Sequence, residues 1–498
     1  MYEHYKPLRN FLRGFNMWSG LGATYFYMRY LSFRSPLPDQ LKNPALRLGK
    51  SNLDAGLYPH LVELLARELI LNAEPRSGKP FNSWVPAFKA MDMIHRLDDK
   101  SWGLHESRSD DILQHLSRIA FKQFPWQSPL TNGVLARYYM LYGHPLVAPM
   151  VEAEFGMTPS ELFQLNLMLI EELMRGPVLA LEFLPAAEPT IREPVLALVD
   201  RLARPNYELK AMMIERQSFD VNWAYSFNPL RAYPLTHAGN PRSVMCPVPP
   251  ILVQRLTDGL YFDLIRADKS FGHAVGKSFE GYVGAVAARI GEGHFDVREE
   301  QSWAKPERRS VDWIVSDPTA TLFVECKLGR LDIASQTELA PEPPFVAAIE
   351  RLAGHVGQLY ATLAEALVGH YPHWQPDGRP IHPLVVTFHE WFCFGPFFHA
   401  HLDRLVAAEF ERRGLDKSLI EQYPYTVCSI EEFEGLLSAC RAGTIESVMS
   451  AKNGPGHRQS LFRGFLAERY PGSLSAAMGT FEDGMEAVAE GPSRLTRR

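Results

Sequence analysis

A short charged strand constrains this chain more than any other stretch of its sequence. The segment SVDWIVSDPTATLFVECKLGR runs from Ser310 to Arg330 and predicts two apolar strands around an Asp-Pro turn. The second strand carries Glu325 and Lys327, which share one face because side chains alternate along a strand. A strand that is otherwise fit for burial therefore holds two opposite charges, and these need a physical reason.

The turn chemistry supplies that reason by predicting a cross-strand partner. A hairpin centred between Pro318 and Thr319 places Asp312 directly opposite Glu325, about 5 Å away. Two carboxylates this close repel each other, and a divalent cation removes the repulsion. Magnesium favours one or two carboxylates with water and phosphate oxygens, and a nearby lysine stabilises developing negative charge. The pattern therefore predicts metal-assisted hydrolysis of a phosphodiester, with Lys327 beside the metal ligands.

An edge-strand ion pair is the alternative interpretation of Glu325 and Lys327, and such a pair adds little to stability. An acidic residue, any residue and then lysine also occurs at positions 98–100 and 208–210. Neither of those copies closes an apolar strand behind a facing aspartate. The copy at 325–327 is thus the one with the surroundings of a metal site.

The first half of the chain is predicted to be largely helical. Apolar residues recur at helical spacing in Ser51–Ala73 and in Met157–Met174. The second of these begins with Thr158, Pro159 and Glu161, which form a helix start signal and a capping box. No glycine-rich phosphate loop is present anywhere in the chain, so no nucleotide-driven motor is indicated.

The second half predicts a small sheet covered by helices. Its elements are helix 271–290, strand 294–303, the hairpin strands within 310–330, helix 345–368 and strand 382–389. We therefore expect a mixed α+β chain, with a helical domain at 1–240, an αβββαβ domain at 241–450 and a C-terminal extension at 451–498. The division near 240 rests on the proline-rich run Phe227–Pro250, and the end of the extension is expected to be disordered.

Composition bounds the environment and the partners. The 498 residues are 46% hydrophobic and 22% charged, as in ordinary globular proteins, and the net charge is −6. Any contact with nucleic acid must therefore come from a local basic surface. The five cysteines form no C-x-x-C pair, which suits a reducing cytoplasm, and the apolar run Asn16–Met28 is too short to cross a membrane. We expect a soluble cytoplasmic protein without a membrane anchor.

Asp312, followed by Glu325-Cys326-Lys327, resembles the pattern of the PD-(D/E)XK nuclease superfamily, whose fold is that of restriction endonucleases. The resemblance covers roughly Leu260 to Phe388, and Val311 stands where the family usually has proline. It implies Asp312 and Glu325 as ligands of Mg²⁺ or Mn²⁺ and Lys327 as a catalytic residue. The family's Q-x-x-x-Y signature is not met, because Gln358 lies two residues before Tyr360.

The resemblance also implies an acidic residue on the helix before the sheet, and Glu280 occupies that position as a third catalytic and metal-binding residue. Its neighbours Gly276, Gly284 and Ala287 are small enough for the helix to approach the sheet closely. The alternative for Glu280 is a solvated residue at the flank of the helix.

The expected function is a metal-dependent nuclease that acts on DNA, in defence against foreign DNA or in repair, with the helical half sensing or selecting the target. RNA as substrate, or a non-catalytic nucleic-acid-binding or scaffold protein that reuses the fold, stays open. Three weaker signals are the H-x-H pair His399 and His401, the basic loop Lys305–Ser310 and the aromatic run Thr387–Phe398. Each is equally well explained by a helix face, a solvated turn or a packed core.

Overall fold

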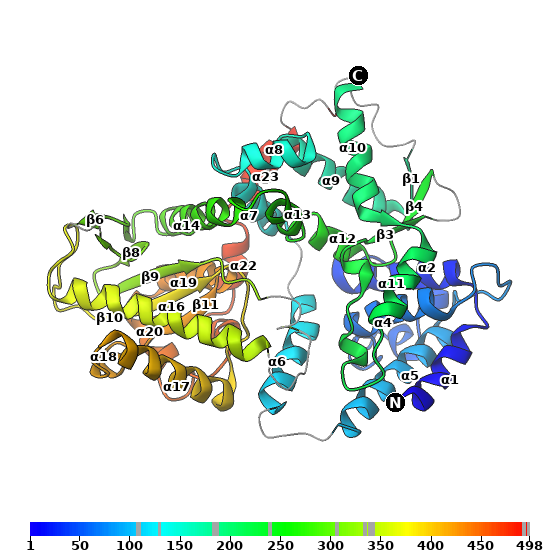
Figure 1. Cartoon of the computed structure of the whole chain (residues 1–498), viewed down its shortest axis with the longest axis horizontal. Coiled ribbons are helices and arrows are strands. Elements are labelled where there is room, and N and C mark those ends of the chain that lie inside the picture. Colours follow the sequence, from blue (N-terminus) through cyan, green and yellow to red (C-terminus); the bar gives the residue numbers. More distant parts are fainter. Residues whose placement is uncertain are drawn as a thin grey trace.

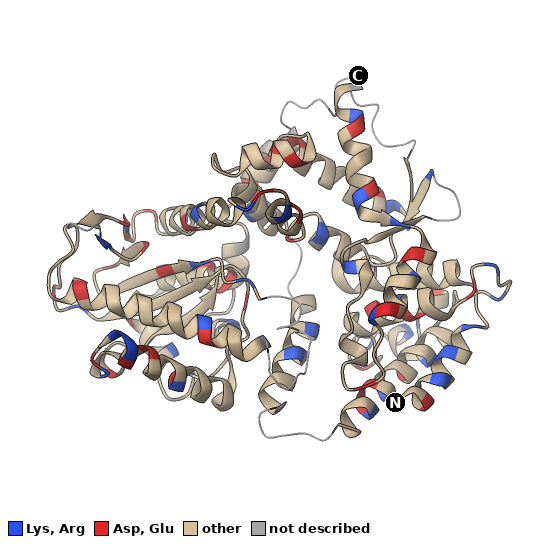
Figure 2. Ribbon diagram, in the orientation of Figure 1, with Lys and Arg blue, Asp and Glu red and all other residues tan. Residues whose placement is uncertain are grey.

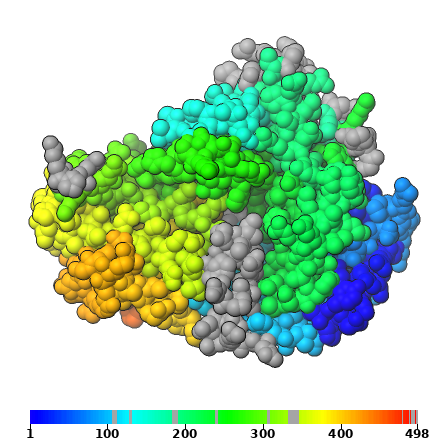
Figure 3. Space-filling view, in the orientation of Figure 1, coloured from blue at the N-terminus to red at the C-terminus, as the bar shows by residue number. Residues whose placement is uncertain are grey.

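The structure is a computed structural model with a mixed α+β fold in which helix predominates (Figure 1). It describes residues 1–105, 111–127, 131–181, 189–237, 242–303, 308–331, 336, 344–490 and 495. Two lobes make up the molecule. The helical lobe comprises residues 1–275 with 482–490, and the sheet lobe comprises residues 279–478. Figure 3 shows the helical lobe in blue to green and the sheet lobe in yellow to orange, joined by green segments.

Helices build the helical lobe around two apolar cores. They are α1 Tyr2–Leu12, α2 Met17–Phe33, α3 Pro44–Arg47, α4 Pro59–Asn72, α5 Trp84–Gly103, α7 Asn132–Tyr142, α8 Ala148–Phe155, α9 Pro159–Arg175, α10 Pro189–Leu202, α11 Asn206–Arg216, α12 Pro249–Arg255 and α13 Leu260–Ala267. Helix α6 Asp111–Gln123 contacts α4 but packs Leu113 and Phe121 against a core of the sheet lobe. The predicted start of α9 is confirmed: Thr158 caps the helix, Pro159 opens it, and Glu161 completes the capping box.

A small sheet that the sequence did not predict also lies in the helical lobe. Its strands are β1 Val178–Ala180, β2 Ala203–Arg204, β3 Leu235–His237 and β4 Ser243–Met245, in the order β1-β4-β3-β2. The expected division near residue 240 falls between β3 and β4, which pair with each other. Residues on both sides of that position share one core.

The sheet lobe is built on a five-stranded sheet in the order β11-β10-β9-β8-β5. Its strands are β5 Asp296–Glu299, β8 Trp313–Ser316, β9 Thr321–Lys327, β10 Ile381–Thr387 and β11 Thr426–Ser429. The pairs β5–β8 and β8–β9 are antiparallel, whereas β9–β10 and β10–β11 are parallel. The predicted strand 294–303 is divided between β5 and the short strand β6 Ser302–Trp303, which pairs with β7 Arg308–Arg309.

Helices cover both faces of this sheet. One face holds α14 Phe271–Ile290 and α19 Ile430–Ala442, and the other holds α16 Pro344–Leu367 and α17 Gly395–Arg413. The bounds of α14 are those expected from the sequence, and α16 differs from the expected helix by one residue at each end. The lobe is completed by α18 Ser418–Gln422, α20 Ile445–Asn453, α21 Phe462–Arg469 and α22 Ser473–Met478.

The end of the chain returns to the helical lobe. Helix α23 Glu482–Glu490 packs on α7 and α9, and its Met485 and Val488 join the second helical core. The sheet lobe is therefore inserted between two segments of one core. Helix α14 continues from that core into the core of the sheet lobe. The expected disorder at the extreme C-terminus falls on residues outside the described part, apart from Leu495.

Among the described residues, every helix is too short or too polar to cross a bilayer.

Candidate active site

The hairpin that carries the candidate site is organised by Asp317. Its Oδ1 accepts backbone N–H groups of Thr319, at 2.7 Å, and Ala320, at 2.9 Å, while its Oδ2 accepts the N–H of Ile445. This turn fixes the register, in which Trp313 pairs with Val324. Continuing the register by one residue sets Asp312 opposite Glu325, as the turn chemistry predicted.

Asp312 and Glu325 are held at the end of the β8–β9 ladder. Asp312 Oδ2 accepts a hydrogen bond of 2.7 Å from the backbone N–H of Cys326, and Glu325 Oε1 lies 2.6 Å from Nζ of Lys327. The two carboxylic acids are 9% and 2% exposed. The structure therefore brings together the aspartate, glutamate and lysine that the sequence selected.

Burial and mutual repulsion weaken the acidity of the carboxylate pair. Burial first and the charge of Glu325 second raise the pKa of Asp312 to about 8, against a smaller lowering by the Cys326 hydrogen bond. Burial also raises the pKa of Glu325, although Lys327 opposes the rise. Burial is the largest single effect on Lys327 and lowers its pKa, but the charge and hydrogen bond of Glu325 together with the charge of Asp312 outweigh it, so the pKa of Lys327 is raised overall. One lysine thus does not neutralise the two acids.

Glu280 lies close enough to affect the pair electrostatically, and it is held by a lysine of its own helix. Its charge raises the pKa of both Asp312 and Glu325. Its Oε2 pairs with Lys277 Nζ, which also lies 3.9 Å from Glu300 Oε2. The sequence analysis did not select Lys277 or Glu300, although the three-residue spacing of Lys277 and Glu280 along a helix is itself a pairing signal.

The close approach of α14 to the sheet depends on one small residue. A methyl group added at Gly284 would stand 2.0 Å from Cζ2 of Trp313, whose Nε1 donates to the carbonyl oxygen of Glu280 at 2.8 Å. A methyl group added at Gly276 would have nothing within 4 Å, so no close packing depends on the small size of this residue. Trp313 therefore anchors the turn of α14 that carries Glu280.

The donor set suits a cation with few protein ligands. Within the described part of the chain, no three His, Cys, Asp or Glu side chains are grouped so as to hold a metal ion, so Glu280 is not gathered with Asp312 and Glu325. Two buried oxygen ligands with raised pKa values remain. Magnesium and manganese accept such a set, because Mg²⁺ keeps several waters and binds through one or two carboxylates. The role of Glu280 as a metal ligand stays a prediction.

The weaker sequence signals have structural explanations. His399 and His401 lie on α17. Residues 305–307 of the predicted basic loop lie outside the described part, and Arg308 and Arg309 pair with Glu365 and Glu300.

Most of the aromatic run is core, because Phe388, Trp391, Phe392 and Phe398 are buried, and Phe397 is the exposed exception. Gln358 points to solvent, in keeping with the missing Q-x-x-x-Y signature.

Charges of both signs are interspersed along the helices of both lobes (Figure 2). No protein-family model, no curated protein and no solved structure matches this chain.

Proposed function

We propose that this protein is a metal-dependent nuclease that hydrolyses phosphodiester bonds in DNA. The observation that carries the proposal is the convergence of Asp312, Glu325 and Lys327 at the end of one hairpin, with the pKa of Asp312 raised to about 8. A structural ion pair requires one acid and one base. Here two buried acids share one lysine, and a divalent cation would balance the additional negative charge.

Asp312 and Glu325 would hold Mg²⁺ or Mn²⁺, which supplies Lewis acidity and positive charge next to a phosphoryl group. Lys327 has a donor fixed by Glu325 and 21% of its side chain exposed, so it is placed to bind a phosphate oxygen or orient water. Glu280 and Lys277, which pair with each other on α14 and are both partly exposed, would help to position the incoming strand.

The arrangement of the sheet lobe supports the resemblance to restriction-endonuclease-like nucleases. The order α14, β5, β8, β9, α16, β10 is the helix, three strands, helix, strand order that the resemblance implies. The antiparallel β5–β8–β9 meander, followed by a helical crossover to parallel β10, surrounds the candidate residues. Because chemistry is carried by sites and not by folds, this order supports the proposal only together with the carboxylate pair.

One observation favours a non-catalytic nucleic-acid-binding protein as the second candidate. Glu325 is 2% exposed and already paired with Lys327, so the described part of the site contains a satisfied ion pair. Metal binding separates the two candidates, because an ion pair alone has no affinity for Mg²⁺.

The test measures cleavage and metal binding on the same variants. Supercoiled DNA, linear DNA and single-stranded RNA are incubated with wild type, Asp312→Asn and Lys327→Met, with Mg²⁺, Mn²⁺ or EDTA. We expect DNA cleavage by wild type with metal and none by either variant. Lys210→Met is the matched control, because it alters another Glu-x-Lys tripeptide on α11 and should cut like wild type.

Calorimetry completes the design. Asp312→Asn should lose metal binding while keeping a side-chain oxygen for the Cys326 N–H, so it retains the fold. The proposal fails if wild type shows no calorimetric Mg²⁺ or Mn²⁺ binding, or if Asp312→Asn cuts as fast as wild type.

A further inference from the structure

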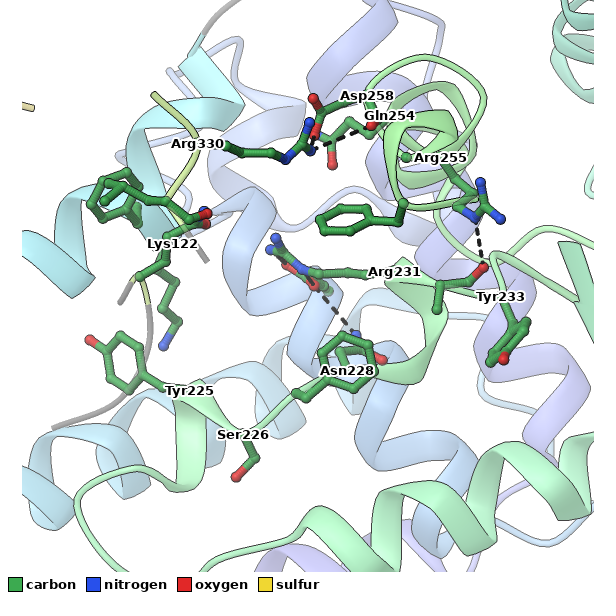
Figure 4. A pocket seen from close by; sticks show the side chains of 18 of the residues that line it. Lys122, Tyr225, Ser226, Asn228, Arg231, Tyr233, Gln254, Arg255, Asp258 and Arg330 are labelled. Carbon is green, nitrogen blue, oxygen red and sulfur yellow. Dashed lines mark hydrogen bonds and ion pairs between the residues drawn. The ribbon is translucent and has the colours of Figure 1, made fainter. Parts of the chain in front are cut away.

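A cavity of about 690 Å³ lies apart from the carboxylate pair, between the two lobes. Most of its lining comes from α4, α6, α8, α10, β2, α12, α13 and the segment 224–233, and Arg330 and Leu331, which follow β9, line it from the sheet lobe. Figure 4 shows Arg231 and Arg330 extending into this space from opposite sides, with Lys122 and Tyr225 along another. The volume lies within the ~300–1,000 Å³ that small-molecule sites occupy.

The lining carries more positive than negative charge. Seven arginine and lysine side chains face four carboxylates, an excess of three positive charges. His60 adds none near neutral pH, because burial lowers its pKa to about 4. This excess stands out in a protein whose net charge is −6.

Each carboxylate in the lining is paired with an arginine. Glu63 accepts two hydrogen bonds from Arg231, at 2.7 and 2.8 Å. Asp263 accepts one of 2.6 Å from Arg255. Asp258 pairs with Arg330, and Glu154 pairs with Arg201. The acids therefore orient these arginines. Of the three remaining cations, Lys122 pairs with Asp98 and Arg204 lies 3.9 Å from Glu208, so Arg266 is the cation that no described acid balances.

Two of these arginines retain donors that no described residue uses. Arg255 donates from Nε to the carbonyl oxygen of Ala232 and from Nη2 to Asp263, but its Nη1 is buried without a partner. The Arg255 side chain is only 10% exposed, so this donor is shielded from bulk water as well. A buried donor without a partner is unfavourable, and an incoming anion would supply that partner. Arg266 lines the same cavity and has no partner among the described residues.

Aromatic surface lies beside the arginines. Phe262 is 42% exposed at the cavity, and Phe121 and Phe227 are only partly buried there. The ring of Phe262 carries the Arg330 guanidinium 4.5 Å from its centre. A ligand that fills the space thus meets arginine side chains and aromatic rings next to each other.

We propose that this cavity binds a small phosphorylated molecule of the nucleotide class. Arginine forks match phosphate oxygens, and exposed aromatic rings stack on bases. A lone phosphate ion would leave most of the volume and the aromatic wall unused. The inference is independent of the proposed cleavage reaction, because none of Asp312, Glu325 and Lys327 lines the cavity.

Part of the cavity lining belongs to the segment that follows the carboxylate pair in the chain. Arg330 follows Lys327 by three residues, and the carbonyl oxygen of Gly329 between them accepts a hydrogen bond of 2.9 Å from Trp391. Arg330 is therefore close in the chain to the candidate lysine, while the Trp391 bond holds the segment between them in place.

Isothermal titration of the full chain with AMP, ATP and cyclic di-AMP tests the proposal. The titrations contain EDTA, so that metal at the carboxylate pair plays no part. At least one of the three should bind with a Kd below about 1 mM. Adenosine, which lacks phosphate, and inorganic phosphate, which lacks a base, should each bind at least about tenfold more weakly.

Two variants and one control localise the binding. Arg266→Gln and Phe262→Ala change exposed side chains, so the fold is kept, and each should weaken binding about tenfold or more. Arg216→Gln is the matched control, because Arg216 is also an exposed arginine in the last turn of a helix, α11, outside the cavity.

The proposal is overturned if none of the three nucleotides binds wild type, if adenosine binds as well as AMP, or if both variants bind like the control. A protein that binds nucleotide but cuts no substrate keeps this inference and loses the proposed function.

Discussion

Asp312 is the residue whose chemistry depends most on its surroundings. An aspartate in water is ionised above pH 4, but burial and the charge of Glu325 raise the pKa of this one to about 8. In the absence of a cation, folding therefore takes up a proton at this position between about pH 4 and pH 8. A group with a raised pKa stabilises the fold at low pH and loses that contribution as pH rises through the folded-state pKa.

Asp312→Asn should therefore change the pH dependence of stability. At pH 5 both proteins have a neutral side chain at 312, so their melting temperatures should nearly agree. At pH 9 wild type holds two ionised acids together and the variant does not, so the variant should melt higher. Thermal unfolding in EDTA from pH 5 to pH 9 measures the difference. A gap that is constant across this range would contradict the raised pKa.

Metal affinity should increase with pH, whereas the stability that the protonated Asp312 gives the metal-free protein is lost as pH rises. Below pH 8 a cation must displace the proton of Asp312, so Mg²⁺ or Mn²⁺ affinity should increase from pH 6 to pH 8 and then level off. Calorimetry in two buffers of different ionisation enthalpy at pH 6.5 should detect close to one proton released per ion bound. Removal of the metal with EDTA should lower the melting temperature at pH 8, because a ligand at 100 times its Kd stabilises a fold by about 2.7 kcal/mol.

At the scale of single elements, α14 shows how helix packing positions a side chain. Its stripe of apolar residues places Val283 and Val286 in the core, and Gly284 lets the ring of Trp313 lie against the helix. The Trp313 ring in turn binds the carbonyl oxygen of Glu280. The placement of Glu280 therefore depends on Gly284, a residue without a functional side chain.

Two glycine substitutions in the same helix should have opposite effects. Gly284→Ala forces a methyl group against Trp313, so we expect a loss of about 1–3 kcal/mol in the free energy of unfolding and reduced cleavage. Gly276→Ala meets nothing within 4 Å and should stabilise the protein by up to about 1 kcal/mol through helix propensity. Urea denaturation of the two variants beside wild type measures both effects. Equal effects in the two variants would show that α14 does not approach Trp313 in solution.

The sequence predicts the helices and strands better than it predicts which residues distant in the chain contact each other. The register of β8 and β9 follows from the local geometry of the Asp317 turn, so the facing of Asp312 and Glu325 is readable in advance. The strands β1 to β4 are only two or three residues long and carry no period to detect. The pair of Arg330 with Asp258 joins residues 72 positions apart, and only the packing of α13 against the sheet lobe brings them together. The proposed nucleotide cavity could not be predicted from the sequence either, because its lining comes from many separate segments.

At the scale of the whole molecule, buried charges join the two lobes. Arg137 on α7 donates from Nη2 to Glu434 on α19 at 2.8 Å and from Nη1 to Glu431 at 3.1 Å. Tyr282 on α14 donates to the same Glu434 at 2.8 Å. Separation of the lobes would leave these groups unpaired, so the junction at α7, α14 and α19 holds the two lobes together.

Arg137→Met should therefore be much more costly than the loss of a surface arginine. It leaves Glu434 buried without its partner, for which a loss of about 3–5 kcal/mol is expected. Arg175→Met removes a pair with Glu171 that is exposed on both sides, and should cost less than about 1 kcal/mol. Chemical denaturation of both variants tests this expectation, and similar midpoints for the two would contradict it.

The return of α23 to the helical lobe has a consequence for how the molecule is made. Residues of α7 and α9 leave the ribosome more than 300 residues before Met485 and Val488, which complete their core. Part of the apolar surface of α7 and α9 therefore stays uncovered while the whole sheet lobe is translated. The first core combines α1, α2, α4 and α5 with residues of α11 and of the segment that ends at Ile251, and among the described residues it contains none beyond Ile251, so it can close early. During synthesis the first helical core can thus form early, whereas the second is completed only when α23 packs against it at the end.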